Sequence, residues 1–243
     1  MRLQVINAGS KGNAFILEAD NTALLIECGV PFNDIKKAVD FNLNKIDCCI
    51  LTHEHKDHSK SINNVLQSGI PVYASRGTFE ALKTPEELQC ILNHAEPRQF
   101  RQWRFVGLNS KHDAKDPMFF NILHPSIGSV LFITDCYLQP YKLQWAFDHV
   151  IIEANYQQST IDAIAESKGE AFVNKRRVKS HMSFEVAMLT LSKLDLSKCK
   201  NIILTHLSEG FTNANEMKAI CESQFGIPTT IAKPGIIINF DSL

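Results

Sequence analysis

The strongest chemical signal in the chain is the segment Leu51-Thr52-His53-Glu54-His55-Lys56-Asp57-His58. It places three histidines and an aspartate within six residues, directly after the apolar run 46–51. Neutral imidazoles and carboxylates are the ligands that Zn²⁺ and Mn²⁺ take in proteins. Because side chains two residues apart in an extended loop project to the same side, His53 and His55 can share one ion. The whole chain has only nine histidines, so we interpret this cluster as a metal site rather than a histidine-rich surface loop.

Short β-rich runs separated by turn residues surround this segment and predict a strand-rich α/β chain. We expect strands at 3–7, 14–18, 22–27, 46–51, 103–108, 118–123, 129–134, 149–152, 201–204 and 235–240. We expect helices at 33–41, from the capping box at 84–87 to about 94, and after the cap residues Ser183 and Asn213. Helices interrupt the strands rather than following each one, which favours layered α/β with mixed sheets over strict βαβ winding. Without repeats or linkers, residues 1–243 are expected to form one domain.

Composition limits the possible partners and the compartment. The chain has 243 residues with 25 basic and 26 acidic side chains, which excludes a protein that holds nucleic acid by bulk positive charge. Seven cysteines without a CxxC pair predict buried thiols in a reducing compartment. The N-terminus lacks a signal-peptide pattern, and no apolar run approaches the roughly 18 residues of a membrane span. We therefore expect a cytoplasmic protein without a membrane segment, and the sequence predicts no oligomeric state.

The HxHxDH pattern at 53–58 resembles the metallo-β-lactamase superfamily, and the resemblance extends along nearly the whole chain. Further segments carry it: the glycine-rich turn 9–13, the strand end 24–29, and the segments 110–114, 132–135 and 203–208. Glu27 stands where the family's strand usually ends in the aspartate of Asp-x-Gly, which is a departure from the family pattern. The resemblance implies an αββα four-layer sandwich with two mixed β-sheets.

The resemblance also implies a dinuclear metal site. It assigns His53, His55 and His112 to the first ion, Asp57, His58 and His206 to the second, and Asp135 to both as a bridge. His124 also precedes Asp135 and is an alternative to His112, which we prefer because it lies in the His-Asp-Ala context. The donor set suits two divalent ions, Zn or Mn, and also Fe.

Other segments indicate the branch of the superfamily. Histidine at position 55 disfavours the oxygen-reducing di-iron branch, which usually has glutamate there. The segments 153–155 and 180–183 resemble elements of ribonuclease Z and of the WalJ/YycJ-like nucleases, and Asn155 in place of threonine favours the latter group. In this interpretation Glu153 orients His181. His181 then donates a proton to the leaving oxygen or holds a phosphate oxygen, while Asp57 also accepts a proton from the attacking water.

A dense basic run leads directly into His181 and consists of Lys175, Arg176, Arg177 and Lys179 around Val178. It either holds phosphates that flank the cut or is a solvated loop. The sequence thus predicts a metal-dependent phosphodiesterase acting on nucleic acid, with DNA favoured over RNA and exonuclease action suggested by the resemblance. The alternatives are a small-molecule ester, thioester or cyclic phosphodiester hydrolase of the same fold, and a non-catalytic binding protein on that fold.

Overall fold

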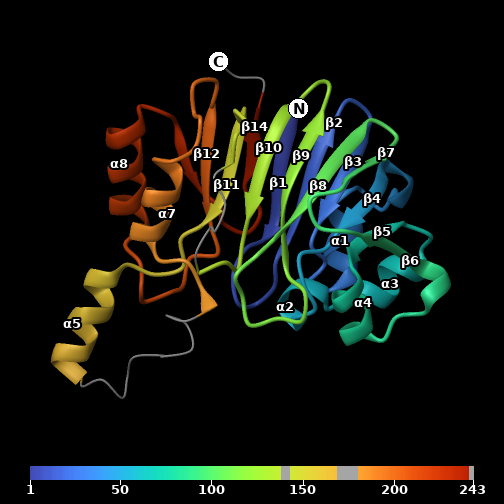
Figure 1. Cartoon of the computed structure of the whole chain (residues 1–243), viewed down its shortest axis with the longest axis horizontal. Helices are drawn as coiled ribbons and strands as arrows, with labels where there is room; N and C mark the ends of the chain where they lie inside the picture. The colour runs from blue at the N-terminus through green and yellow to red at the C-terminus, as the bar shows by residue number, and fades with distance from the viewer. Residues whose placement is uncertain (138–142, 169–179, 241–243) are drawn as a thin grey trace.

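The computed structural model describes residues 1–137, 143–168 and 180–240, and its strands form two sheets of seven (Figure 1). The first sheet runs in the order β14 (Ile237–Asn239), β1 (Arg2–Asn7), β2 (Ala14–Ala19), β3 (Thr22–Ile26), β4 (Ile46–Ile50), β5 (Val72–Ser75), β6 (Gln89–Leu92). The second runs in the order β13 (Thr229–Ile231), β12 (Asn201–Thr205), β11 (His149–Glu153), β10 (Gly128–Ile133), β9 (Met118–His124), β8 (Trp103–Asn109), β7 (Pro97–Phe100). Both sheets contain parallel and antiparallel pairs, so the prediction of mixed sheets is confirmed.

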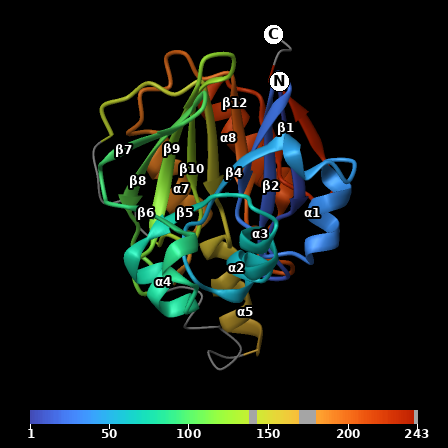
Figure 2. The ribbon, with the colours of Figure 1, turned by 90° about the vertical axis from the view of Figure 1, so that its right-hand side faces the viewer.

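Helices cover the outer face of each sheet. The first sheet is covered by α1 (Phe32–Ala38), α3 (Ile62–Gln67) and α4 (Arg76–Leu82), which stand in front of it in Figure 2. The second sheet is covered by α7 (Phe184–Leu191) and α8 (Ala214–Phe225) (Figure 1). The short helix α2 (Lys56–Ser59) lies at the lower edge of the sheets in Figure 1, and α5 (Gln158–Lys168) projects beyond them. Two 3₁₀ turns, Leu43–Lys45 and Glu86–Leu88, complete the described elements.

Three apolar clusters separate these four layers, because successive side chains of a strand point to opposite faces of its sheet. In β10, Val130 and Phe132 enter the cluster shared by the two sheets. Leu131 and Ile133 enter the cluster beneath α7 and α8 instead. A third cluster lies between the first sheet and α1, α3 and α4. The described residues thus have the predicted αββα layering.

The prediction of a helix from Thr84 to about His94, which rests on the capping box, is wrong. A 3₁₀ turn covers Glu86–Leu88, and Gln89–Leu92 is the edge strand β6, which pairs in parallel with β5. The Thr84 hydroxyl accepts a hydrogen bond from the Gln89 side chain at 3.3 Å instead of capping a helix. Pairing with β5 satisfies the backbone groups of this segment and buries Leu92, which outweighs the weak local helix signal.

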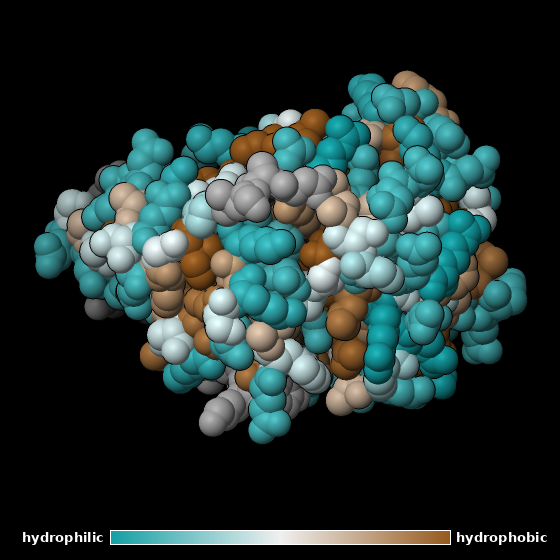
Figure 3. All heavy atoms as spheres, turned by 90° about the horizontal axis from the view of Figure 1, so that it is seen from above, coloured by the Kyte–Doolittle hydropathy of each residue, from teal (hydrophilic) through white to brown (hydrophobic). Residues whose placement is uncertain are grey.

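The cysteines are free and mostly buried, as the sequence predicts. All seven cysteines are free, and five of them are buried. Within the described ranges, no helix has the length and apolar character that crossing a membrane requires. The face that carries the N-terminus is mostly hydrophilic, with scattered apolar residues (Figure 3).

The carboxyl ends of several strands meet at the edge where α2 lies. The chain leaves β4 into the histidine-rich segment, while β10, β11 and β12 end just before Asp135, at Glu153 and just before His206. Since open α/β sheets bind ligands at the carboxyl ends of their strands, this edge is where a functional site is expected.

Candidate metal centre

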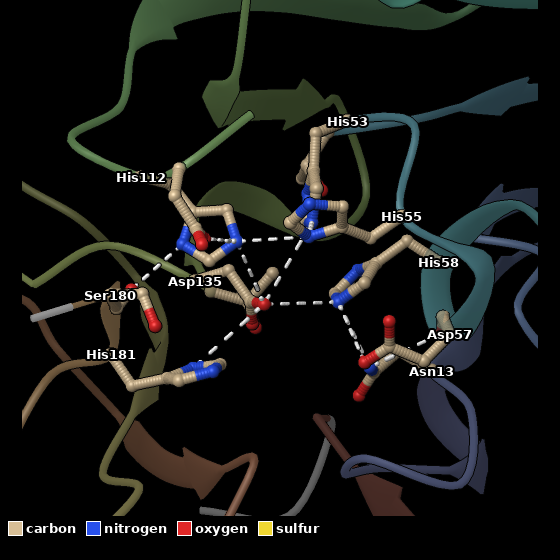
Figure 4. Close-up of polar contacts among 12 residues, drawn as sticks. Asn13, His53, His55, Asp57, His58, His112, Asp135, Ser180 and His181 are labelled. Carbon is tan, nitrogen blue, oxygen red and sulfur yellow. Dashed lines mark hydrogen bonds and ion pairs between the residues drawn. The ribbon is translucent and has the colours of Figure 1, made fainter. Parts of the chain in front are cut away.

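The residues predicted to bind metal converge on one point of this edge (Figure 4). Three groups of described residues have potential ligand atoms within 4.8 Å of one another, and the third joins Asp135 and His206 to Glu153 and His181. The predicted ligands make up the other two: His53, His55, His112 and Asp135, and Asp57, His58, Asp135 and His206. Asp135 belongs to both groups, as a bridging ligand must. The alternative His124 ends β9 and belongs to no such group in the described part of the chain.

The spacing of the first group fits a divalent ion. His55 Nδ1 lies 3.0 Å from His53 Nε2 and 3.2 Å from His112 Nε2. Asp135 Oδ2 lies 3.5 Å from His112 Nε2. A tetrahedral ion with bonds of 2.0–2.1 Å holds its ligand atoms about 3.3 Å apart. These four side chains therefore have the chemistry and the separation that such an ion requires.

In two histidines of this group, a polar contact at one ring nitrogen leaves the other nitrogen, which faces the group, available to bind metal. His112 Nδ1 donates to the carbonyl oxygen of Ser180 at 2.7 Å, which leaves Nε2 as the lone-pair nitrogen. Nδ1 of His53 lies 2.9 Å from the hydroxyl of Thr52. The backbone around Ser180 thereby orients a histidine that is 68 residues earlier in the chain.

The second group concentrates negative charge around buried imidazoles. His206 Nε2 lies 3.5 Å from Asp135 Oδ1 and 3.8 Å from Asp57 Oδ2, and it has no hydrogen-bond partner among the described residues. Burial lowers the pKa of His206, but the carboxylates of Asp135, Asp57 and Glu153 outweigh burial and raise it to about 10. A cluster that favours positive charge so strongly suits a divalent cation, which displaces protons from its ligands.

Glu27 supports this group from beneath. It is fully buried, and its Oε1 lies 3.5 Å from His58 Nδ1 while its Oε2 accepts from the Thr52 amide at 3.4 Å. Burial raises the pKa of Glu27, and His58 opposes this shift. The longer glutamate thus still reaches the histidine from the position where the family usually has aspartate.

Three site residues have left-handed backbone conformations within two residues of the ends of their strands. The φ angles are 62° for Glu27, 48° for Asp135 and 57° for His206. Such a conformation costs a residue other than glycine on the order of 1–3 kcal/mol, and surrounding contacts must maintain it. The chain therefore turns sharply at each strand end, where these side chains meet the cluster.

The glycine-rich turn at 9–13 holds the segment that carries Asp57 and His58. Asn13 donates its backbone N–H to the carbonyl oxygen of Asp57 at 2.6 Å, and its side-chain oxygen accepts from Gly9 at 2.8 Å. The Asn13 side-chain nitrogen also lies 3.1 Å from His58 Nε2 (Figure 4). Gly29 donates to the carbonyl oxygen of Asn13 at 2.9 Å, so the turn, the strand end and α2 are joined.

Replacing Gly29 by alanine should disrupt this junction. The added Cβ would overlap the carbonyl carbon and oxygen of Asp57, and relief of the overlap has to move α2. We expect a loss of about 1–3 kcal/mol in the free energy of unfolding, together with reduced metal content. Urea denaturation and elemental analysis after desalting measure the two effects.

Gly69→Ala is the matched control for Gly29→Ala. A Cβ at Gly69 meets no atom of the described chain within 4 Å, although its φ of 80° makes alanine unfavourable there. This variant should lose stability without losing metal. Equal metal content in the two variants would contradict the role assigned to Gly29.

His181 and Glu153 form a pair beside the cluster. His181 Nδ1 donates to Glu153 Oε1 at 2.7 Å, and Glu153 Oε2 accepts from the Cys136 amide at 3.0 Å. The Glu153 side chain is fully buried, whereas that of His181 keeps 21% of its surface exposed. Burial lowers the pKa of His181, but Glu153 outweighs burial and the pKa is raised. The pair therefore holds a proton on a reachable imidazole.

Some supporting residues were not identified as functional from the sequence. Asn155 donates from its side chain to the His206 carbonyl at 2.9 Å, and the same nitrogen lies 2.8 Å from His206 Nδ1. Its place two residues after Glu153 is the only signal in the sequence, and that signal indicates a branch of the superfamily rather than a contact with His206. Asn13, Thr52 and the Ser180 carbonyl gave no separate signal. The basic run of Lys175, Arg176, Arg177 and Lys179 lies outside the described residues.

A cavity of about 410 Å³ opens over the cluster. Its lining includes His181, Asn155 and Ser208 as well as Ser10 and Lys56. The candidate metal ligands therefore face a space that a phosphodiester can enter.

Comparison with known proteins agrees with this geometry. Residues 8–132 match the family model of the metallo-beta-lactamase superfamily. The chain is 24% identical to the exodeoxyribonuclease YycJ of Bacillus anthracis, over 92% of this chain and 88% of the relative. It is 29% identical to a ribonuclease of Thermus thermophilus, over 40% of this chain and 27% of the relative. The solved structure of YhfI from Bacillus subtilis has a TM-score of 0.75 at 19% identity, over 98% of both chains, and shares the fold.

Proposed function

This chain belongs to the metallo-beta-lactamase superfamily, and we propose that it is a two-metal nuclease that hydrolyses DNA, with exonuclease action. The relatives that match over 92% and 86% of this chain are named as exodeoxyribonucleases, and the chain is a metal-dependent hydrolase of phosphodiester bonds. The observation that carries the proposal is the His181–Glu153 pair, whose imidazole lies 3.8 Å from Asp135. The pair places a protonated imidazole beside the candidate metal ligands. A proton donor in that position can protonate the oxygen that leaves when the P–O bond breaks.

The proposed ligands are the converging side chains described above, with Asp135 as the bridge. Zn²⁺ or Mn²⁺ suits these nitrogen and oxygen donors, and Fe suits them as well. Two ions bound there would supply Lewis-acid activation of water and would neutralise charge on the phosphoryl oxygens.

The chain's own residues then perform the proton transfers. Asp57, with 28% of its side chain exposed at the cavity, accepts a proton from the attacking water. His181 donates a proton to the leaving oxygen, and Glu153 holds the imidazole in the orientation for this donation. Burial and the Asp135 carboxylate raise the pKa of Glu153, but contacts with His181 and His206 outweigh them and lower it, so Glu153 stays ionised beside the imidazolium.

Hydrolysis assays on the protein reconstituted with Zn²⁺ or Mn²⁺ test the proposal. We expect cleavage of bis(p-nitrophenyl) phosphate and of single- or double-stranded DNA, with products released from the ends of the strand. RNA of the same sequence is the first competitor, because the Thermus thermophilus relative is named a ribonuclease. Faster cleavage of RNA would overturn the DNA assignment. Hydrolysis of a thioester or lactone without cleavage of either nucleic acid would overturn the nuclease proposal.

A further inference from the structure

Lys56 is placed rigidly beside the metal centre, although it is not one of the predicted ligands. It is the first residue of α2, between His55 and Asp57 in the chain. The helix is fixed on both sides: Asn13 donates to the Asp57 carbonyl at 2.6 Å, and the Ser59 hydroxyl donates to the Glu54 carbonyl at 2.8 Å. The backbone of Lys56 therefore cannot move without moving two predicted ligands.

The side chain of Lys56 has no ionic partner in the described ranges. Some lysines elsewhere in the described chain are paired, such as Lys37 with Asp34 at 3.5 Å and Lys45 with Asp40 at 3.4 Å. Lys56 is exposed, and it lines the 410 Å³ cavity over the cluster. An uncompensated ammonium at this cavity favours an anionic ligand.

Ser10 brings a neutral donor to the same cavity. It lies in the turn at 9–13, which is exposed at Ser10 and Lys11 but buried at Gly12 and Asn13. A Cβ at Gly12 would lie 2.5 Å from the carbonyl oxygen of Gly29, so the turn is packed closely against the strand end. A lysine ammonium and a serine hydroxyl on two fixed backbones are typical phosphate contacts in nucleic-acid complexes.

We propose that Lys56 and Ser10 form a subsite for a phosphate of the nucleic acid that neighbours the scissile phosphate. The inference rests on the proposed nuclease function and adds a reason for choosing polynucleotides over small phosphate esters. A phosphodiester with a single phosphorus cannot occupy both the metal centre and this subsite, whereas a strand can. Lysine contributes a point charge here, so the subsite acts on every base sequence alike and weakens with salt.

The test compares Lys56→Ala with Lys60→Ala in the metal-loaded protein. Lys60 directly follows α2, is exposed, and does not line the cavity, so it matches Lys56 in charge and neighbourhood. KM for a single-stranded oligonucleotide is measured from initial rates at several KCl concentrations, and metal content is measured in each sample. Lys56→Ala should raise KM about 3- to 10-fold and make the slope of log KM against log salt shallower by about 0.7. Lys60→Ala should leave both values at the wild-type level, and Lys56→Arg should restore the slope.

Ser10→Ala should raise KM by a smaller factor without changing the salt slope, because the hydroxyl carries no charge. If Lys56→Ala keeps the wild-type slope while the wild type cleaves DNA, the subsite is overturned and the nuclease proposal stands. If Lys60→Ala changes the slope as much as Lys56→Ala does, the effect is one of general surface charge and the subsite is overturned. If the wild type cleaves neither DNA nor RNA, both proposals fall together.

Discussion

Replacing His181 by glutamine should lower kcat for DNA hydrolysis about 10²- to 10⁴-fold while leaving the metal content unchanged. Glutamine is close to histidine in size, but its amide cannot transfer a proton to the leaving oxygen. The imidazole lies beside the predicted metal ligands, with its ring centre 5.1 Å from that of His206. Rapid-quench measurement of kcat, together with elemental analysis of the same sample, checks both parts of the expectation.

The leaving group separates proton donation from phosphate binding by His181. The leaving group in DNA hydrolysis is a sugar alkoxide that needs a proton, whereas the leaving group of bis(p-nitrophenyl) phosphate is a stable phenolate. His181→Gln should therefore impair DNA hydrolysis much more than hydrolysis of the nitrophenyl ester. An equal loss on both substrates would contradict proton donation and favour a role in holding a phosphate oxygen.

Glu153→Gln is the companion variant that tests positioning. The amide can still contact His181 at the 2.7 Å site, but it removes the carboxylate that raises the imidazole pKa. We expect a smaller loss of kcat than for His181→Gln. The fall in the rate of DNA hydrolysis at high pH, which reports deprotonation of His181, should also move to lower pH. A profile identical to that of the wild type would contradict the positioning role.

Contiguity explains which parts of the site could be predicted. His53, His55, Asp57 and His58 fall within six residues, so their chemistry can be seen without any knowledge of the fold. Asp135 comes from another sheet, and nothing local marks it as a partner of this segment. Only the resemblance to a family brought it into the prediction, together with His112 and His206.

The strands and helices show the same division between local and long-range information. The alternation in β10 and the cap residues Ser183 and Asn213 are local, and the caps accept from Val186 and Glu216 as expected. The short strands β5, β7 and β13 were not predicted, because three or four residues carry too little periodicity. The helix expected after Thr84 was wrong because β6 depends on pairing with β5.

The left-handed residues could not be predicted either. Glutamate, aspartate and histidine carry no local reason to adopt positive φ at 27, 135 and 206, where glycine would be favoured. Contacts from distant elements maintain these conformations, such as the Ser110 hydroxyl that donates to the Asp135 carbonyl oxygen at 3.1 Å. Local sequence therefore identifies candidate ligands, while tertiary contacts determine where they point.

Asp135→Asn should abolish binding of both metal ions and lower kcat by more than about 10⁴-fold, which is the largest effect we expect of any substitution. Ring nitrogens of five histidines lie 3.3–3.8 Å from the Asp135 carboxylate oxygens: His53, His58, His112, His181 and His206. The carboxylate is buried, with 2% of its side chain exposed, so water does not replace its charge. Metal titration followed by elemental analysis gives the number of ions bound.

Asp57→Asn is the comparison that distinguishes a bridge from an ordinary ligand. Asp57 lies only in the second group, 3.8 Å from His206 Nε2 and 3.6 Å from His58 Nε2. Its loss should remove one ion and leave the group of His53, His55 and His112 able to bind the other. Because asparagine keeps the size of aspartate in both variants, a difference between Asp135→Asn and Asp57→Asn reports charge and position rather than a cavity. One ion retained in Asp135→Asn would show that the two groups bind independently, which would contradict the bridging role.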